Sequence, residues 1–284
     1  MSNSNNSFAL IGFPLGHTMS PQIHDALFKL ASKSASYATL ELAPERLSQE
    51  YHSLRNLSGY NVTIPHKIAI IPLLDGLDES AKRYGAVNCV KNGDLAIGYN
   101  TDVIGFTRSI SAMGASLSGK TLILGCGGVG RMMAIESALN GADLTIAVRQ
   151  TDEDLQAAKK VKSYILQICP NTNVEITGLD NINNEFDLII NATPVGMYPH
   201  ADVSPITKEL AGKTRFLFDA IYNPMETILM RHAKEQGAKV QGGMAMLVYQ
   251  AVAAHEIWYN SSYNDKDIAD LIDNMGNQLG RIFK

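Results

Sequence analysis

The sequence has few cysteines, no long apolar run and no excess of basic charge. Cys89, Cys126 and Cys169 are scattered, with neither metal-ligand spacing nor an even disulfide framework, which favours a reducing compartment. No apolar run approaches the roughly 20 residues needed to span a bilayer, and the polar start of the chain is unlike a secretory leader. The net charge of −4, from 24 basic and 28 acidic residues, gives no indication of nucleic-acid binding. We therefore expect a soluble, cytoplasmic protein.

The chain is rich instead in short apolar runs that alternate with helical stretches, a pattern typical of an α/β fold. Its 284 residues are enough for two domains. We expect an N-terminal α/β substrate-binding domain at 1–105, completed by returning C-terminal helices at 244–284. A Rossmann-type dinucleotide-binding domain is expected at 106–243.

The expected elements of the first domain are strands near 8–13, 37–42 and 60–64, helices near 21–32, 44–56, 67–74 and 79–84, and a hairpin of 86–90 with 95–99. The Asn92-Gly93 pair favours a tight turn with positive φ in that hairpin. A connecting helix is expected at 101–114. The expected elements of the second domain are strands near 121–125, 144–148, 174–178, 187–191, 216–221 and 239–241, with helices near 129–140, 152–167, 205–211 and 226–236. Helices near 244–259 and 266–282 close the chain.

A glycine-rich segment dominates the middle of the chain. The apolar run 121–124 leads into GCGGVG at 125–130, and a helix-forming stretch follows. In a dinucleotide site Gly125 would permit the tight turn, Gly127 would let backbone N–H groups approach a pyrophosphate, and Gly130 would let helix and strand pack closely. The turn also contains Cys126, Gly128 and Val129. A glycine-rich turn can be purely structural, but the strand and helix around this one favour a cofactor site.

The residue that ends the next strand selects between the two dinucleotides. A carboxylate there binds a ribose 2′-hydroxyl, whereas arginine accommodates a 2′-phosphate. Arg149 occupies this position and no acid precedes it, which favours NADP. NAD remains possible, because Asp152 or Asp154 could reach a 2′-hydroxyl if the turn is shifted.

Two windows place polar groups where ligands of α/β sheets bind, at strand ends. Lys67 follows a strand and Pro65, so it could be a partly desolvated proton carrier or simply one more solvated lysine. Asp102 follows a strand and opens a helix, so it could be an N-cap or the partner of Lys67. Asn88 supplies an amide nearby.

Thr18 and Ser20 precede a helix that has proline at its start. Ser20 as a helix cap is the simpler interpretation. The alternative is that both hydroxyls receive a carboxylate at a helix N-terminus. His17, His24 and His66 lack recognised ligand spacing, so we expect no metal site.

The ordered windows GFPLGHTMSP, NVTIPHK, GAVN, GYNTDVIGF, GCGGVG, NATPVGM, DAIYNP and GMAMLVYQ together resemble the shikimate dehydrogenase family. The resemblance runs from Gly12 to Gln250. It implies NADP-dependent, reversible reduction of 3-dehydroshikimate to shikimate in aromatic amino acid biosynthesis, by a monomer or homodimer acting on a small molecule.

The resemblance also implies roles for particular residues. The catalytic pair falls on Lys67 and Asp102. The implied substrate ligands are Thr18, Ser20, Thr63, Lys67, Asn88, Asp102, Tyr222 and Gln250. The implied cofactor ligands are Gly125, Cys126, Gly127, Gly128, Val129, Gly130, Arg149, Thr193, Ala220 and Gly243.

Two departures from the family pattern keep alternatives open. Thr18 stands where the family often has serine, and Val148-Arg149-Gln150 stands where it often has Asn-Arg-Thr. The second departure removes two polar groups beside the adenosine phosphate. An NAD-linked quinate/shikimate dehydrogenase of broader specificity is therefore one alternative. A methylenetetrahydrofolate dehydrogenase and a catalytically silent NAD(P)-binding sensor are others, although Thr18/Ser20 weighs against folate and the Lys67/Asp102 pair against a sensor.

Overall fold

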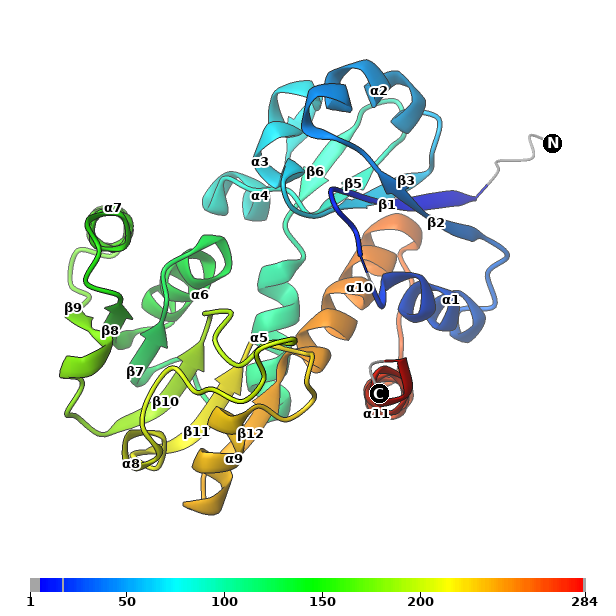
Figure 1. Cartoon of the computed structure of the whole chain (residues 1–284). Helices are drawn as coiled ribbons and strands as arrows, with labels where there is room; N and C mark the ends of the chain where they lie inside the picture. The colour runs from blue at the N-terminus through cyan, green and yellow to red at the C-terminus, as the bar shows by residue number, and fades with distance from the viewer. Residues whose placement is uncertain (1–5, 17, 283–284) are drawn as a thin grey trace. The chain divides into compact units, whose positions relative to one another are not determined.

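The computed structural model describes residues 6–16 and 18–282. The chain divides into two compact units, Met1–Gly105 with Val248–Gln278 and Phe106–Leu247 with Leu279–Lys284. Each unit is built on one six-stranded sheet (Figure 1). Within the described part of the chain, no helix is long and apolar enough to cross a membrane.

The first unit has the strand order β2-β1-β3-β5-β6-β4. Strands β1, β2 and β3 are parallel, whereas β5 runs antiparallel to β3 and to β6. The strands are β1 (Ser7–Gly12), β2 (Ser36–Glu41), β3 (Gly59–Val62), β4 (Gly76–Leu77), β5 (Cys89–Lys91) and β6 (Ile97–Tyr99). The helices are α1 (Ser20–Leu30), η1 (Pro44–Arg46), α2 (Leu47–Leu54), α3 (His66–Ala69), η2 (Ile71–Leu73) and α4 (Glu79–Tyr84).

Successive residues of a strand point to opposite faces of a sheet, and β1 uses both faces for burial. Phe8 packs with Phe28 and Trp258 in one apolar cluster. Ala9 and Ile11 belong to a second cluster, which includes residues of α2 and α4. The parallel core of this sheet is therefore covered on both sides, as parallel strands require.

The hairpin of β5 and β6 forms, but its turn differs from the expectation. Five residues, 92–96, connect the strands, and neither Asn92 nor Gly93 is among the described residues with positive φ. The reason is that the Asn92 side chain donates to Leu54 O at 2.8 Å and Leu57 O at 2.9 Å. These bonds tie the loop to the end of α2, so the tight Asn-Gly turn predicted for this loop is wrong.

The second unit has an all-parallel sheet in the order β12-β11-β10-β7-β8-β9. Renumbered from its first strand, this is the 3-2-1-4-5-6 order of a dinucleotide-binding sheet. The strands are β7 (Gly119–Leu124), β8 (Ala142–Val148), β9 (Val174–Gly178), β10 (Phe186–Asn191), β11 (Thr214–Asp219) and β12 (Lys239–Gly242). The helices are α6 (Gly128–Leu139), α7 (Asp152–Ile168), η3 (Leu179–Asn181), α8 (Lys208–Ala211) and α9 (Ile228–Glu235).

Three helices carry the chain between the two units or close it: α5 (Asp102–Ala112), α10 (Gly243–Tyr259) and α11 (Asp265–Ile282). The unit boundaries fall inside all three helices. The side chains of α10 are almost entirely buried up to Ala254. Helix α10 thus provides core to both units without forming a sheet of its own.

Candidate active site

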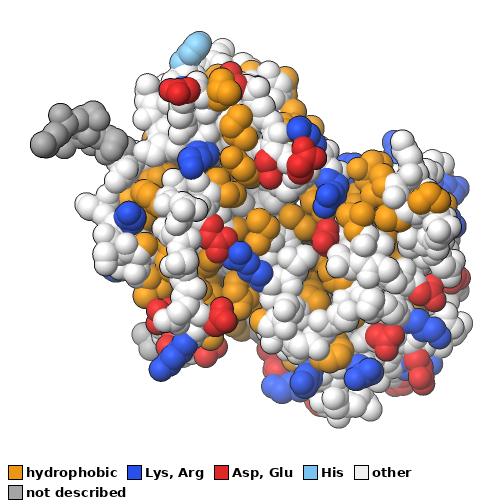
Figure 2. Space-filling model, turned by 180° about the vertical axis from the view of Figure 1, so that it is seen from behind, with side chains coloured by type: hydrophobic (Ala, Val, Ile, Leu, Met, Phe, Trp, Pro, Cys, Tyr) orange, Lys and Arg blue, Asp and Glu red, His pale blue; other side chains and the backbone are white. Residues whose placement is uncertain are grey.

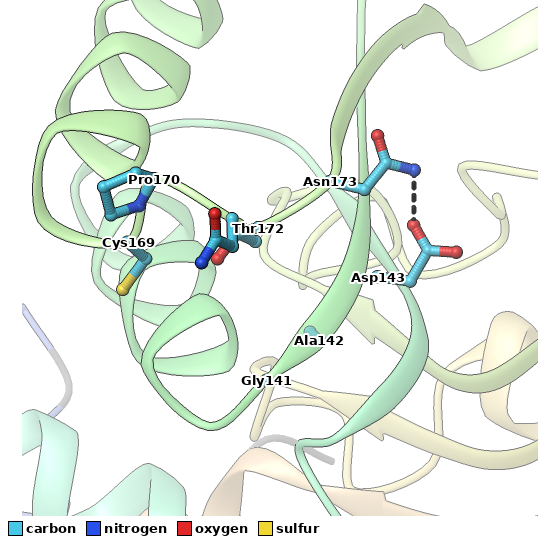
Figure 3. A pocket seen from close by; sticks show the side chains of 8 residues that line it. Gly141, Ala142, Asp143, Cys169, Pro170, Thr172 and Asn173 are labelled. Atoms are coloured by element: carbon cyan, nitrogen blue, oxygen red, sulfur yellow. Dashed lines mark hydrogen bonds between the residues drawn. The ribbon is translucent and has the colours of Figure 1, made fainter.

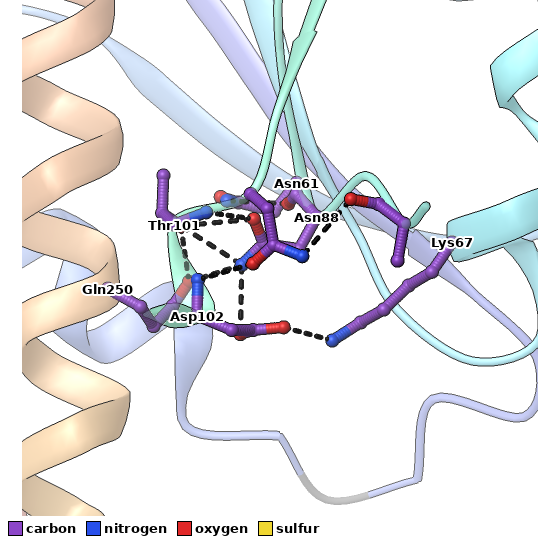
Figure 4. A network of polar contacts seen from close by, with 8 residues as sticks. Asn61, Lys67, Asn88, Thr101, Asp102 and Gln250 are labelled. Carbon is purple, nitrogen blue, oxygen red and sulfur yellow. Dashed lines mark hydrogen bonds and ion pairs between the residues drawn. The ribbon is translucent and has the colours of Figure 1, made fainter. Parts of the chain in front are cut away.

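Lys67 and Asp102 form an ion pair in the first unit, with Lys67 Nζ at 2.6 Å from Asp102 Oδ2 (Figure 4). Lys67 lies in α3, which follows β3, and Asp102 is the first residue of α5, which follows β6. Strands β3 and β6 are both antiparallel to β5, so their carboxyl ends share one edge of the sheet. The side chains are 26% and 18% exposed, which leaves the pair accessible but partly shielded.

Asn88 holds the second oxygen of the Asp102 carboxylate. Its Nδ2 donates to Asp102 Oδ1 at 2.9 Å, and its Oδ1 accepts the Thr101 N–H at 2.6 Å. Gln250, from α10, lies at the same network, with Oε1 3.4 Å from Asn88 Nδ2. Because both ends of the Asn88 amide are bonded, its orientation is fixed. Asn88 therefore holds the Asp102 carboxylate through the oxygen that does not contact Lys67.

Asn61 and Thr101 belong to this network but are absent from the predicted site. Both are buried. Asn61 Nδ2 donates to Asn88 O at 3.2 Å, and Thr101 Oγ1 accepts from Asn88 Nδ2 at 2.9 Å. The sequence could have indicated both, because each is a polar residue inside a motif of the predicted site: Asn61 in NVTIPHK and Thr101 in GYNTDVIGF. We infer that they position Asn88.

Asp102 is the first helical residue of α5, and its N–H donates to Asn100 Oδ1 at 3.1 Å. Ser20 is not a cap. The N-cap of α1 is Met19, which makes no side-chain cap bond, and Ser20 is the first helical residue. Thr18 replaces the expected cap, since its Oγ1 accepts the Ser20 N–H at 3.2 Å and lies 3.1 Å from Ser20 Oγ.

The Thr18/Ser20 pair follows β1, and Thr63 follows β3 directly, so all three lie at the sheet edge of Lys67 and Asp102. Thr63 is half-buried, and its N–H donates to Ile11 O at 2.9 Å. Across the described ranges, no direct hydrogen bond joins these three side chains to the Lys67 network.

The histidines of the first unit have other partners. His24 pairs with His255, and His66 Nε2 lies 2.5 Å from Leu42 O. His17 lies outside the described residues. Over residues 6–16 and 18–282, no group of three or more His, Cys, Asp or Glu side chains could hold a metal ion.

The glycine turn of the second unit, at 125–130, is tightly packed on one side and open on the other. Gly125 has φ +89°, and a Cβ on Gly130 would collide with the Gly125 carbonyl oxygen. A Cβ on Gly127 or Gly128 would meet no atom within 4 Å, so the space over the turn is open. No side chain caps the start of α6 at Gly127. The unpaired N–H groups of this helix start can therefore bind an anion.

Cys126 and Val129 complete the turn. A cavity of about 390 Å³ adjoins it, lined by Cys126, Arg131, Lys160 and Tyr164 among others. Burial raises the pKa of the Cys126 thiol to about 11, so this group is protonated at neutral pH.

Arg149 follows β8, at the position expected to contact the adenosine ribose. It is bound to Asp154, with Arg149 Nε at 2.6 Å from Asp154 Oδ2 and Nη2 at 3.3 Å from Oδ1. Thr151, not an acid, caps α7, since its side chain accepts the Asp154 N–H. The arginine expected to bind a phosphate is thus already paired with a carboxylate.

Thr193, Ala220, Tyr222 and Gly243 lie at the carboxyl ends of β10 and β11 and at the start of α10. Thr193 Oγ1 donates to Asn191 Oδ1 at 2.7 Å, and its methyl group lies over Gly125. The Gly243 N–H donates to Ile221 O at 2.9 Å, and a Cβ on Gly243 would collide with Ala220 O. Tyr222 is half-buried, and burial raises its pKa.

Asp219 organises this edge, although the predicted site does not contain it. Its fully buried carboxylate accepts from Asn191 Nδ2 at 3.0 Å, Ile221 N at 3.0 Å and Thr227 Oγ1 at 2.7 Å. Burial raises its pKa. The acid at the end of β11 was visible in DAIYNP, and we infer that it shapes the backbone of 220–222.

A cavity of about 460 Å³ lies elsewhere, lined by Gly141, Asp143, Cys169 and Asn173 among others (Figure 3). It is at the amino ends of β8 and β9, where Asn173 Nδ2 donates to Asp143 Oδ1 at 2.7 Å. Ligands of parallel sheets bind at the opposite, carboxyl ends. This cavity is therefore not the candidate site.

Known proteins resemble this chain over most of its length. Residues 10–90 match the family model described as the shikimate dehydrogenase substrate binding domain. A shikimate dehydrogenase (NADP(+)) of Caldanaerobacter subterraneus subsp. tengcongensis is 35% identical over 92% of this chain and 93% of its own. One from Methanocaldococcus jannaschii is 39% identical, over 88% and 89%. The chain belongs to the shikimate dehydrogenase family.

A solved shikimate dehydrogenase, that of Thermus thermophilus in complex with NADP(H) and shikimate, superposes with a TM-score of 0.82. It is 29% identical and covers 95% of this chain and 99% of its own. The resemblance to the shikimate dehydrogenase family predicted from the ordered windows is confirmed, as is the α/β class with a Rossmann-type sheet.

Proposed function

We propose that this protein catalyses the NADP-dependent, reversible reduction of 3-dehydroshikimate to shikimate, the reaction of aromatic amino acid biosynthesis. The observation that carries the proposal is the Lys67–Asp102 pair at the carboxyl edge of the first sheet, with Nζ 2.6 Å from Oδ2. The curated relatives are named for this activity. The first unit would bind the substrate and the second the cofactor.

Lys67 would act as the general acid. In the reductive direction its ammonium donates a proton to the alkoxide that forms at C3, and in the reverse direction the amine accepts that proton. Asp102 would hold both the ammonium and the neighbouring substrate hydroxyl, so that the proton is transferred over a short, fixed distance. When bound, the nicotinamide supplies the hydride.

The remaining first-unit residues would orient the substrate. Thr18 and Ser20 present hydroxyls for its carboxylate at the start of α1. Asn88 and Gln250 present amides beside Asp102, and Thr63 lies at the same edge. The family resemblance adds Tyr222 as a ligand of a ring hydroxyl.

The second unit would hold the cofactor through the turn 125–130, with the pyrophosphate on the N–H groups at the start of α6. Arg149 would face the adenosine ribose, and Thr193, Ala220 and Gly243 would line the nicotinamide end. The open space over Gly127 and Gly128 supports this assignment.

The cellular compartment, the lack of nucleic-acid binding and the oligomeric state are also proposals. The three cysteines are free, which fits the reducing cytoplasm. On the face seen in Figure 2, acidic and basic side chains are interspersed, and neither sign forms the continuous field that nucleic acid requires. We propose a monomer or homodimer, which sedimentation velocity would distinguish.

The test is an assay of NAD(P)H formation with shikimate and quinate, each offered with NADP and with NAD. Turnover of shikimate with NADP supports the proposal. Efficient turnover of quinate with NAD would instead favour a broader quinate/shikimate dehydrogenase, a second candidate that the Arg149–Asp154 pair favours. No turnover in any of the four mixtures would instead favour the hypothesis of a non-catalytic NAD(P)-binding sensor.

A further inference from the structure

The ion pair of Arg149 with Asp154 bears on the choice between NADP and NAD. Both guanidinium bonds point to one carboxylate, through Nε at 2.6 Å and Nη2 at 3.3 Å. This two-point contact is the same fork by which arginine binds a phosphate. The carboxylate of Asp154 therefore occupies the donor face that a ribose 2′-phosphate would use.

Asp154 is the fixed member of the pair. Its backbone N–H is held by the Thr151 side chain at 3.3 Å, in the first turn of α7. Its side chain is 25% exposed, whereas that of Arg149 is 72% exposed. The Arg149 guanidinium also lowers the pKa of Asp154, so the carboxylate remains charged at neutral pH.

The two cofactors would meet this pair differently. A 2′-phosphate must share Arg149 with a carboxylate of its own sign, and the fixed position of Asp154 keeps that negative charge close. A 2′-hydroxyl can instead donate to the Asp154 carboxylate, the contact that acidic residues at this strand end make in NAD-binding sheets.

We propose that Asp154 is a specificity-determining residue, which withholds Arg149 from the 2′-phosphate of NADP and offers an acceptor to the 2′-hydroxyl of NAD. The protein then discriminates less strongly in favour of NADP than it would without the Asp154 carboxylate. This inference rests on the proposed function only in placing the cofactor at the 125–130 turn.

The test is calorimetric titration of the full-length protein with NADP⁺ and with NAD⁺, without substrate. Asp154→Asn keeps the size of the side chain and removes its charge. We expect NADP⁺ to bind about tenfold more tightly, the value of one charge-assisted hydrogen bond, and NAD⁺ to bind more weakly. The matched control is Glu153→Gln, which removes a neighbouring exposed carboxylate charge in the same helical turn and for which we expect less than about a twofold effect on either cofactor.

A double-mutant cycle separates the proposed route from a general charge effect. If Asp154 acts by holding Arg149, the gain in NADP⁺ affinity disappears when Asp154→Asn is combined with Arg149→Ala. An unchanged ratio of the two affinities in Asp154→Asn, or an equal shift in Glu153→Gln, would overturn the inference. Failure of the unmutated protein to bind either dinucleotide would overturn the cofactor assignment itself.

Discussion

Lys67 and Asp102 are 35 residues apart in the sequence and 2.6 Å apart in space, between Nζ and Oδ2. Neither residue is exposed enough to be an ordinary surface pair, and Asn88 holds the second carboxylate oxygen. Ion pairs that water can reach contribute little to stability, so stabilisation alone is a weak explanation for this arrangement. A role as proton carrier and positioning partner explains it better.

Lys67→Met is expected to lower kcat by about 10²–10⁴-fold, the usual contribution of general acid–base catalysis. Methionine keeps the length of the side chain but supplies no proton. KM for shikimate should change much less than kcat, because the loss occurs mainly in the transition state. Steady-state kinetics on purified protein measures both.

Lys82→Met is the matched control, because Lys82 is also an ion-paired lysine of the first unit, bonded to Glu79 at 2.8 Å. It lies in α4 and has no proposed role, so its kcat should stay near that of the unmutated enzyme. Equal losses in kcat and in substrate affinity for Lys67→Met would refute the acid–base role.

Asp102→Asn tests the partner. The amide has the shape of the carboxylate but no charge, so it loses the ion pair with Lys67 and one of its oxygens becomes an NH₂ group. We expect kcat to fall and KM for shikimate to rise together, because Asp102 would position both the lysine and a substrate hydroxyl. The control is Asp94→Asn in the exposed loop between β5 and β6. Unchanged turnover and affinity in Asp102→Asn would remove this residue from the site.

Two glycine substitutions separate folding from cofactor binding. Gly130→Ala places a methyl group against the Gly125 carbonyl, so both the melting temperature and NADP⁺ affinity should fall. Gly127→Ala adds a methyl group that meets no protein atom within 4 Å, at a residue with φ −69°. Its melting temperature should therefore be unchanged, while NADP⁺ binds more weakly because the methyl group lies where the pyrophosphate approaches. Tight NADP⁺ binding by Gly127→Ala would place the cofactor elsewhere.

The sequence predicts the elements well where the local pattern is strong and poorly where a tertiary contact decides. Strand β9 has the predicted bounds, since the alternation of apolar and polar residues in VEITG is enough to locate it. Strand β4 was missed because Gly76–Leu77 has only two residues, too few for any periodicity. The 92–96 loop was mispredicted because Asn92 is bonded to the end of α2, a contact distant in sequence.

The same division holds at the site. Lys67 and Asp102 could be brought together from the sequence, because both follow strands whose carboxyl ends share an edge. The capture of Arg149 by Asp154 could not, since it depends on which way two side chains of one loop turn. The sequence does not single out Asp219, because its role depends on three hydrogen-bond partners that only the structure shows.

The buried pair of His24 and His255 predicts acid sensitivity. His24 Nδ1 lies 3.0 Å from His255 Nε2, and His24 also stacks on Tyr37 with ring centroids 4.0 Å apart. Burial lowers the pKa of His255 to about 3 and that of His24 well below its usual 6.5, so both are neutral in the folded protein. His24 Nε2 has no hydrogen-bond partner among the described residues, so a proton added there would be unpaired.

The direction in which stability changes with pH follows from the protons that the chain takes up on unfolding. Below pH 6.5 the unfolded chain protonates both histidines while the folded chain does not, so stability is complete above pH 6.5 and falls as the pH drops. The loss is up to about 1.4 kcal/mol per pH unit for each histidine, and it continues toward the folded pKa. Urea unfolding between about pH 7.5 and 5, followed by the fluorescence of Trp258 beside this cluster, measures this loss of stability.

His24→Phe keeps an aromatic ring against Tyr37 and removes one titrating group, so its stability should fall less steeply with acid. His52→Gln, on the exposed face of α2, should leave the slope unchanged. Parallel pH profiles for His24→Phe and the unmutated protein would show that the buried pair does not set the acid limit.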